Sequence, residues 1–171
     1  QQAVDDLMVE GERVVGLVPL AAVFALGTRG GIVKRVSVDV PANKAEWPVI
    51  ALRDGDEVVA AATCADDDVL VFVTSGASLL RFGADAVRPQ GRTAAGMAGI
   101  KLPADATVVA FAVAREDDLV ATVAAGRGGQ ASSAKATALA AYPGTGRGTS
   151  GVRCHRLLRD EIGRASCRER V

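Results

Sequence analysis

A unit of two short apolar segments recurs along this chain. A Val-Val pair opens the unit each time, and its copies begin at Val14, Val58 and Val108, after spacings of 44 and 50 residues. The second apolar segment of the unit covers residues 22–28, 69–74 and 119–123. Acidic turns with the sequences ADDD and REDD join the two segments in the later copies. Self-similarity at this period indicates an array in which each unit packs on its neighbours.

Each copy continues with a glycine turn and a basic segment. The first reads TRGGIVKRVSVDV and the second TSGASLLRF, whereas the third, AAGRGGQASSAKATAL, is looser. Gly30 and Gly31 favour a tight hairpin, because glycine accepts the positive φ that such turns require. Beyond them Val36, Val38 and Val40 alternate with polar residues, which is the period of a half-buried strand. With 49% apolar residues, only 4% aromatic residues and 19 glycines, the composition favours an all-β fold.

A glycine-rich loop closes the second and third copies. It reads VRPQGRTAAGMAGIKL over residues 87–102 and YPGTGRGTSGVRCHRL over residues 142–157. Gly91 and Arg92 of one loop align with Gly146 and Arg147 of the other, and Gly96 aligns with Gly151, each 55 residues later. The repeats therefore run roughly over residues 7–52, 53–102 and 103–157. Units of four strands at this period predict the blades of a propeller-like array.

The loop of the third copy also satisfies the pattern G-x-G-x-x-G, through Gly146, Gly148 and Gly151. A dinucleotide-binding turn needs a helix directly after the glycines and an acidic residue about 20 positions further on. In the sister loop Thr93 stands where Gly148 stands, so that glycine is not a shared feature of the loops. We therefore interpret the segment as a flexible loop around Arg147, of a kind that suits a phosphate backbone.

Charge and cysteine content restrict the remaining classes of function. The formal net charge is zero, which argues against a globally basic protein but allows a basic face balanced by acidic turns. Cys64, Cys154 and Cys167 are too far apart for a C-x-x-C zinc motif, so we expect no metal site. The longest apolar run, residues 14–27, contains Pro19 and is shorter than the ~20 residues of a membrane helix. These features predict a soluble cytoplasmic protein with no membrane segment.

The last eleven residues, EIGRASCRERV over 161–171, differ abruptly from the rest. They are polar and rich in arginine, and they resemble the translation of a sequencing-library adapter. We expect them to be a non-native tail, so that native sequence stops near Asp160, in the middle of a repeat. Without them the chain has 17 basic and 18 acidic residues. A blade array that is cut inside a blade would expose an unpaired strand edge.

Three of these segments resemble a known family. The strings TRGGIVKR, TSGASLLRF and above all VRPQGRTAAGMAGIKL are similar to the repeats in the C-terminal domain of bacterial type IIA topoisomerase A subunits, the DNA gyrase A and topoisomerase IV A family. The resemblance covers residues 7–160. It implies a partial β-pinwheel with about three four-stranded blades, in which neighbouring blades exchange strands.

The resemblance also implies a function. Duplex DNA would bend around a basic rim and be presented for strand passage by an ATP-dependent topoisomerase, an isomerase. The parent enzyme would form an A2B2 assembly with an ATPase B subunit that holds ATP and Mg²⁺, whereas this segment has no catalytic residue and no cofactor. The glutamine-rich basic box of true gyrases is absent from the sequence. Carried over by motif, the DNA-contacting residues would be Arg29, Lys34, Arg35, Arg81, Arg88, Arg92, Lys101, Arg147, Arg153 and Arg156, with Lys135 as a further candidate.

A second hypothesis is a propeller-like scaffold that binds proteins and has no nucleic-acid role. Basic residues on a strand can belong to an ordinary solvated face. The two hypotheses differ in whether the chain binds non-specific duplex DNA at low salt.

Overall fold

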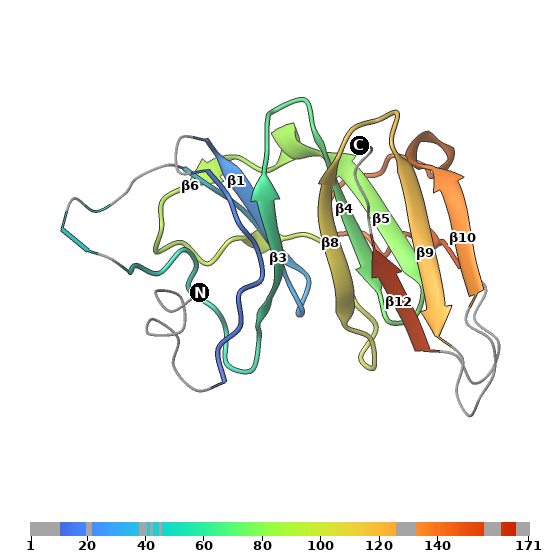
Figure 1. The fold of residues 1–171 in the computed structure, drawn as a ribbon, viewed down its shortest axis with the longest axis horizontal. Helices are drawn as coiled ribbons and strands as arrows, with labels where there is room; N and C mark the ends of the chain where they lie inside the picture. The colour runs from blue at the N-terminus through green and yellow to red at the C-terminus, as the bar shows by residue number, and fades with distance from the viewer. Residues whose placement is uncertain are drawn as a thin grey trace.

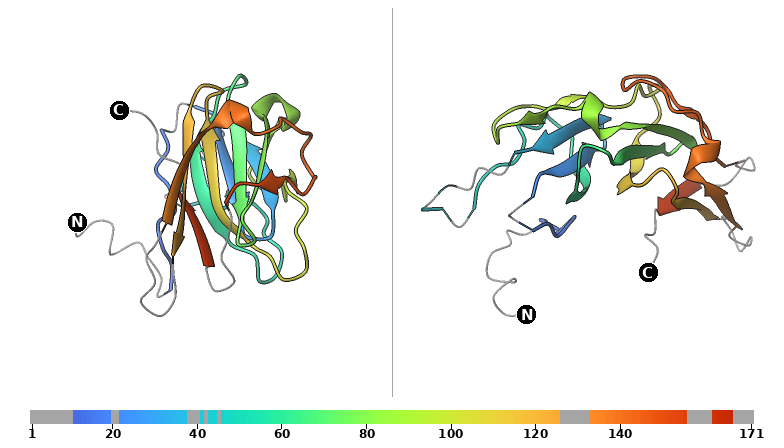
Figure 2. Two further views of the ribbon diagram at one scale, coloured as in Figure 1. Left: turned by 90° about the vertical axis from the view of Figure 1, so that its right-hand side faces the viewer. Right: turned by 90° about the horizontal axis from the view of Figure 1, so that it is seen from above.

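In the computed structural model, residues 11–19, 22–37, 41, 43–44, 46–125, 133–155 and 162–166 are described. They form three β-sheets that follow one another along the molecule (Figure 1). Seen from above, the sheets fan out along an arc (Figure 2). The predicted all-β blade array is confirmed.

The first sheet has five strands. They are β1 (Phe24–Thr28), β2 (Ile32–Val36), β3 (Val58–Thr63), β6 (Pro89–Gln90) and β7 (Met97–Ala98). Their order is β3-β1-β2-β6, and β7 also pairs with β2. The hairpin β1–β2 thus comes from the first repeat, whereas the other three strands come from the second.

The second sheet repeats this arrangement one unit later. Its order is β11-β5-β4-β8. The hairpin of β4 (Val69–Thr74) and β5 (Ser78–Gly83) comes from the second repeat. The outer strands, β8 (Val108–Ala114) and β11 (Val152–Arg153), come from the third. Each of these two sheets therefore combines two repeats, which is the strand exchange expected of a pinwheel.

The third sheet contains β9 (Leu119–Ala125), β10 (Ser133–Ala138) and β12 (Ile162–Ser166), in the order β10-β9-β12. β12 lies in the segment that the sequence set apart as a non-native tail. It pairs with β9 in the place that β3 and β8 occupy on β1 and β4. Main-chain hydrogen bonds make few demands on side chains, so an open strand edge accepts such a segment. The origin of the tail stays a prediction.

The hairpin turns of the first two repeats have the same construction. The N–H groups of Gly31 and Ala77 donate to the carbonyls of Thr28 and Thr74, at 3.0 and 2.9 Å. Gly31 has a φ of 85° and Ala77 a φ of 58°, so both residues adopt the left-handed conformation. The glycine expected here is therefore required by the turn in one copy and replaced by alanine in the other.

The strand expected at the first Val-Val pair is not formed, since residues 11–19 contain no strand. The later pairs do open strands, β3 at Val58 and β8 at Val108. Both of these strands pair with the hairpin of the preceding repeat. The alternation expected at Val38 and Val40 lies outside the described residues.

Two short 3₁₀ turns, η1 (Ala84–Ala86) and η2 (Leu139–Ala141), follow the hairpins of the second and third repeats. Between neighbouring sheets lie the main apolar clusters of the molecule. One contains Leu70, Phe72 and Phe111, and the other contains Val71, Val120 and Leu139. Because β4 sends alternate side chains into both clusters, all six of its residues are buried.

Candidate nucleic-acid interface

The loop at residues 143–151, the Gly-Arg loop of the third repeat, connects η2 to strand β11. A β-strand follows its glycines, and the described residues after them, 152–155, contain no helix. Gly151 has a φ of 73°, and a Cβ atom there would collide with the carbonyl oxygen of Leu79. The glycine thus permits close packing on β5. This arrangement agrees with the rejection of a dinucleotide site.

The sister loop of the second repeat uses its aligned glycine in the same way. Gly96 has a φ of 82°, and an added Cβ would lie 2.8 Å from the carbonyl oxygen of Val33 on β2. The predicted correspondence of Gly96 and Gly151 is therefore confirmed. In both repeats the glycine presses the loop against the second strand of the preceding hairpin.

The Gly-Arg loop of the third repeat lies on a segment of the second. The N–H of Gly148 donates to the carbonyl of Gly99 at 2.6 Å, and the N–H of Lys101 donates to the carbonyl of Thr149 at 2.9 Å. Arg147 spans the same contact, because its Nε and Nη1 donate to the carbonyls of Ala86 and Ala98, at 3.2 and 3.3 Å. Arg147 is thereby fixed beside the 86–101 segment, which also carries Arg88, Arg92 and Lys101.

The basic residues predicted for the rim divide into two groups by their exposure. Those with exposed or partly exposed side chains are Arg29, Arg88, Arg92, Lys101, Arg147 and Arg153. Arg29 forms an ion pair with Glu57 at 3.1 Å, and both side chains are about half exposed. Lys135 is also exposed, and its Nζ donates to the carbonyl of Cys154 at 3.3 Å. Arg156 lies outside the described residues.

Lys34, Arg35 and Arg81 form the second group, and for them the expected exposed position is wrong. Their relative exposures are 0%, 2% and 9%. The alternation of β2 and β5 places Arg35 and Arg81 on the faces that the next blade covers, whereas Lys34 lies on the opposite face of β2, beneath Val49 and the loop at residues 92–94. Their polar groups therefore bind acceptors of the protein.

Lys34 lies in a cage of carbonyl groups. Its Nζ donates to the carbonyls of Val49, Arg92 and Ala94, at 2.7, 2.8 and 2.8 Å. Burial lowers the pKa of Lys34, while the three carbonyls satisfy all three N–H donors of the ammonium. Because Arg92 and Ala94 belong to the loop that closes the second repeat, Lys34 attaches that loop to the first repeat.

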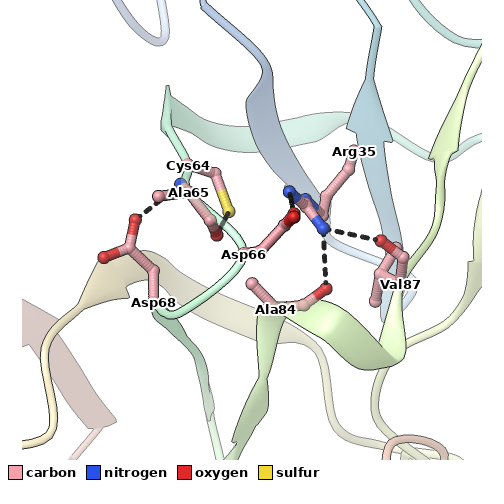
Figure 3. A network of polar contacts seen from close by, with 7 residues as sticks. All are labelled: Arg35, Cys64, Ala65, Asp66, Asp68, Ala84 and Val87. Atoms are coloured by element: carbon pink, nitrogen blue, oxygen red, sulfur yellow. Dashed lines mark hydrogen bonds and ion pairs between the residues drawn. The ribbon is translucent and has the colours of Figure 1, made fainter.

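Arg35 and Arg81 make contacts that we call the arginine clasps. Arg35 Nη1 donates to the carbonyls of Ala84 and Val87, at 3.1 and 3.2 Å, and Nη2 forms a short ion pair with Asp66 (Figure 3).

In the second clasp, Arg81 Nε donates to the carbonyl of Tyr142 at 2.6 Å, and Nη1 forms an ion pair with Glu116 at 2.5 Å. Both arginines thus belong to the hairpin of one repeat and bind the next repeat.

The part of the chain that the structure describes has no cluster of three or more His, Cys, Asp or Glu side chains suited to a metal ion, and it has no helix long and apolar enough to cross a membrane. Burial raises the pKa of the Cys64 thiol to about 11 and also raises that of Cys154. Both cysteines therefore remain protonated and unreactive at neutral pH. His155 lies between two hydroxyl groups, with Nδ1 2.9 Å from Thr122 Oγ1 and Nε2 3.1 Å from Ser133 Oγ.

A comparison with protein families assigns this architecture. The family described as "DNA gyrase C-terminal domain, beta-propeller" matches residues 48–65, 68–115 and 133–160, which is more than half of the chain. The chain belongs to the DNA gyrase A C-terminal domain family.

Curated members of the gyrase A family agree with this assignment. The DNA gyrase A protein of Mycobacterium leprae is 40% identical over 138 residues, which cover 77% of this chain and 10% of that protein. The DNA gyrase A protein of Salmonella typhimurium is 35% identical over 150 residues, or 82% of this chain and 16% of that protein. The chain thus spans a tenth to a sixth of the length of these gyrase proteins.

Solved structures of the family have the same fold. The crystal structure of the C-terminal domain of DNA topoisomerase IV has a TM-score of 0.70 and 27% identity, covering 84% of this chain and 44% of that one. The E. coli ParC C-terminal domain has a TM-score of 0.64 at 17% identity, covering 84% and 62%, and shows the fold alone.

The arginine clasps are the feature of this gyrase-type domain that sequence reasoning missed. A signal was present, because Asp66 and Glu116 occupy the same place in the acidic turns ADDD and REDD. The β3–β4 and β8–β9 connections that carry these turns both lie at the upper edge in Figure 1. Asp66, Glu116 and Asp85 line a cavity of about 410 Å³ beside Arg81. Its acidic lining does not suit a phosphate group.

Proposed function

We propose that this chain binds duplex DNA without sequence preference and bends it along the convex side of the blade array. The packing of the third repeat's Gly-Arg loop on the 86–101 segment carries this proposal. It gathers basic side chains of two repeats on one continuous stretch of surface, which we call the loop surface and define as Arg88, Lys101 and Arg147. Cations in this arrangement neutralise phosphates and read no base sequence.

The curvature of the array supports the bending part of the proposal. In both complete sheets the short strands β6 and β11 lie at one end of the strand order and β3 and β8 at the other. The right-hand view of Figure 2 places the segments next to β6 and β11 along the outer side of the arc. A duplex that follows the loop surface from blade to blade would curve with it, and added phosphate contacts would offset the cost of bending.

In the longer parent protein, the bent duplex would be the segment presented for strand passage by an ATP-dependent topoisomerase. We propose the same partners as the family resemblance implies, namely double-stranded DNA and an ATPase B subunit in an A2B2 assembly. The B subunit would hold ATP and Mg²⁺, and the reaction would take place on cytoplasmic DNA.

The test is the affinity of the chain for a short duplex of arbitrary sequence, measured by fluorescence anisotropy over a range of salt concentrations. We expect the chain to bind the duplex at about 50 mM salt. The logarithm of the binding constant should fall linearly with the logarithm of the salt concentration. The triple variant Arg88→Ala, Lys101→Ala and Arg147→Ala should bind more weakly and reduce the salt slope by about 3, since each phosphate contact contributes about 1.

Arg53→Ala provides the matched control, because Arg53 is an exposed arginine outside the loop surface. Its affinity and salt slope should equal those of the unsubstituted chain. Absence of binding by a folded sample at about 50 mM salt would contradict the proposal and favour the protein-interaction scaffold. If the duplex bends, its two ends approach each other. Energy transfer between labels on those ends should then increase when the chain binds.

A further inference from the structure

The two arginine clasps occupy equivalent places in successive repeats. Arg35 on β2 pairs with Ala25 on β1, and Arg81 on β5 pairs with Val71 on β4. Each side chain is almost fully covered, with exposures of 3% and 11%. A guanidinium at such a depth cannot lie against a phosphate backbone, so these arginines must act through the groups that they bind.

The first clasp holds both ends of a short turn that leads into basic sequence. Arg35 donates to the carbonyls of Ala84, the first residue of η1, and Val87, the residue directly after it. Arg88, an exposed member of the loop surface, follows Val87 directly. The first repeat therefore fixes the position of the main chain that carries Arg88 in the second repeat.

The second clasp holds the start of the Gly-Arg loop. Besides the bond from Arg81 Nε to Tyr142, the main chain of Arg81 accepts a hydrogen bond from the N–H of Thr145 at 3.2 Å. Arg81 and Gly144 also form a parallel β-bridge. Arg81 thus contacts Tyr142 through its side chain and Gly144 and Thr145 through its main chain, shortly before Arg147.

The surroundings of the two clasps match in detail. Val87 and Tyr142 both donate their N–H to the first residue of a 3₁₀ turn, at 3.0 Å in each case. The acidic turns that supply the carboxylates are closed by the same bond, from the N–H of Ala65 to Asp68 and from that of Arg115 to Asp118, each at 2.7 Å. In the third repeat Ala136 stands three residues before its 3₁₀ turn, as Arg81 does, and cannot form a clasp.

We propose that Arg35 and Arg81 are positioning residues for DNA binding, each holding the DNA-contacting loop of the next repeat in place on the convex side of the array. This inference rests on the proposed function. A planar guanidinium donates in fixed directions, and this makes it suited to fixing a loop through carbonyl groups. The carboxylates of Asp66 and Glu116, which are 85% and 62% exposed, orient the guanidinium groups from the solvent side.

Double-substitution cycles on DNA affinity test this proposal. Arg81→Met should weaken binding several-fold and reduce the salt slope by about 1, because the contact of Arg147 is lost with its loop. In an Arg147→Ala background, the further effect of Arg81→Met should be less than about twofold, since the two changes remove the same contact. Arg35→Met should be coupled to Arg88→Ala in the same way.

The crossed pairs are the matched controls. Arg81→Met with Arg88→Ala, and Arg35→Met with Arg147→Ala, should give effects on affinity that multiply, because each clasp holds a different loop. The inference is overturned if the unsubstituted chain binds DNA and the fold-changes in affinity multiply in all four pairs of substitutions. That result would mean that the arginines do not position the loops. If the unsubstituted chain does not bind DNA, the proposed function fails as well.

Hydrogen exchange of the chain without DNA gives a second measurement, and Arg81→Lys provides a milder variant that keeps the charge but not the forked geometry. We expect faster exchange at the amides of Thr145 and Gly148 and unchanged exchange at Val87. Arg35→Lys should show the opposite pattern. Unchanged exchange at Thr145 and Gly148 would overturn the inference even if DNA affinity fell.

Discussion

The junction between the first and second sheets and the junction between the second and third share one backbone plan. Beside the first junction, the N–H of Gly99 after β7 donates to the carbonyl of Gly31 in the β1–β2 turn at 2.8 Å, and beside the second, the N–H of Cys154 after β11 donates to the carbonyl of Ala77 in the β4–β5 turn at 2.9 Å. An arginine clasp crosses each junction. The repeat therefore conserves main-chain contacts from one junction to the next.

The side chains that fill the two junctions differ. In the first, the ring of Phe72 lies 4.9 Å from that of Phe111 and 6.3 Å from that of Phe82. Gly99 leaves room for them, since a Cβ atom there would lie 2.8 Å from Phe72. In the second, Thr122 takes the place of Phe72 on its strand and Cys154 that of Gly99. A large residue that faces glycine in the first junction is replaced by two residues of intermediate size in the second. The repeat therefore fixes the position of the main chain but allows different side chains to fill the junction.

The largest effect should follow from removing the aromatic filling of the first junction. Phe72→Ala should lower the free energy of unfolding by about 3–5 kcal/mol, because the cavity opens at a position that is 0% exposed. Thr122→Ala, at the equivalent place in the second junction, should cost only about 1 kcal/mol. Denaturant unfolding of both variants measures the difference. Equal losses would show that the two junctions are not filled differently.

Replacing Lys34 by methionine should have the next largest effect. The variant removes the Lys34 donor from the partly buried carbonyls of Val49, Arg92 and Ala94, of which Ala94 keeps the N–H of Ala51 at 3.3 Å, at a cost of about 3 kcal/mol. Leu80 occupies the same place in the second repeat, and Leu80→Met is the control, with an expected loss below about 1.5 kcal/mol. Denaturant unfolding provides the comparison. A loss for Lys34→Met no greater than that control would mean that the cage adds no stability.

A smaller effect should separate the facing residues of the two junctions. Gly99→Ala should destabilise the chain by about 1–3 kcal/mol, because the new methyl group meets Phe72 and the carbonyl of Gly31. Cys154→Ala should cost about 1 kcal/mol, since it removes one buried thiol group from the apolar cluster of the second junction. Thermal unfolding of both variants makes the comparison. A gain in stability for Gly99→Ala would contradict the close packing of the first junction.

The smallest effect concerns the buried thiol of the first junction. The pKa of Cys64 is about 11 in the folded chain, above its ordinary value of 9.0. The folded state therefore holds the proton more tightly, and this stabilisation is complete below pH 9 and is lost as pH rises from about 9 to 11. At about pH 9.5 the loss should be about 1 kcal/mol. Cys64→Ala should remove this part of the pH dependence of unfolding.

Much of the fold could be predicted from local sequence. The Val-Val pairs at Val58 and Val108 marked strands that are formed, and the alignment of Gly96 with Gly151 identified equivalent loops correctly. These features depend on the chirality of the main chain and on the period of strands, which act over a few residues. The absence of a strand near Val14 could not be predicted, because its partner would be a hairpin of another repeat.

The candidate site shows where sequence reasoning stops. By itself the sequence determined a β-blade repeat, its turn glycines and the Gly-Arg loops that carry Arg92 and Arg147. Only the tertiary structure decided which basic residues face outward. In an isolated sheet, alternate residues of a strand point to a buried face and to a solvent-exposed face. A blade between two others in an array has both of its faces covered. Arg35 and Arg81 therefore point into the neighbouring blade, whereas Arg88 is exposed on the rim.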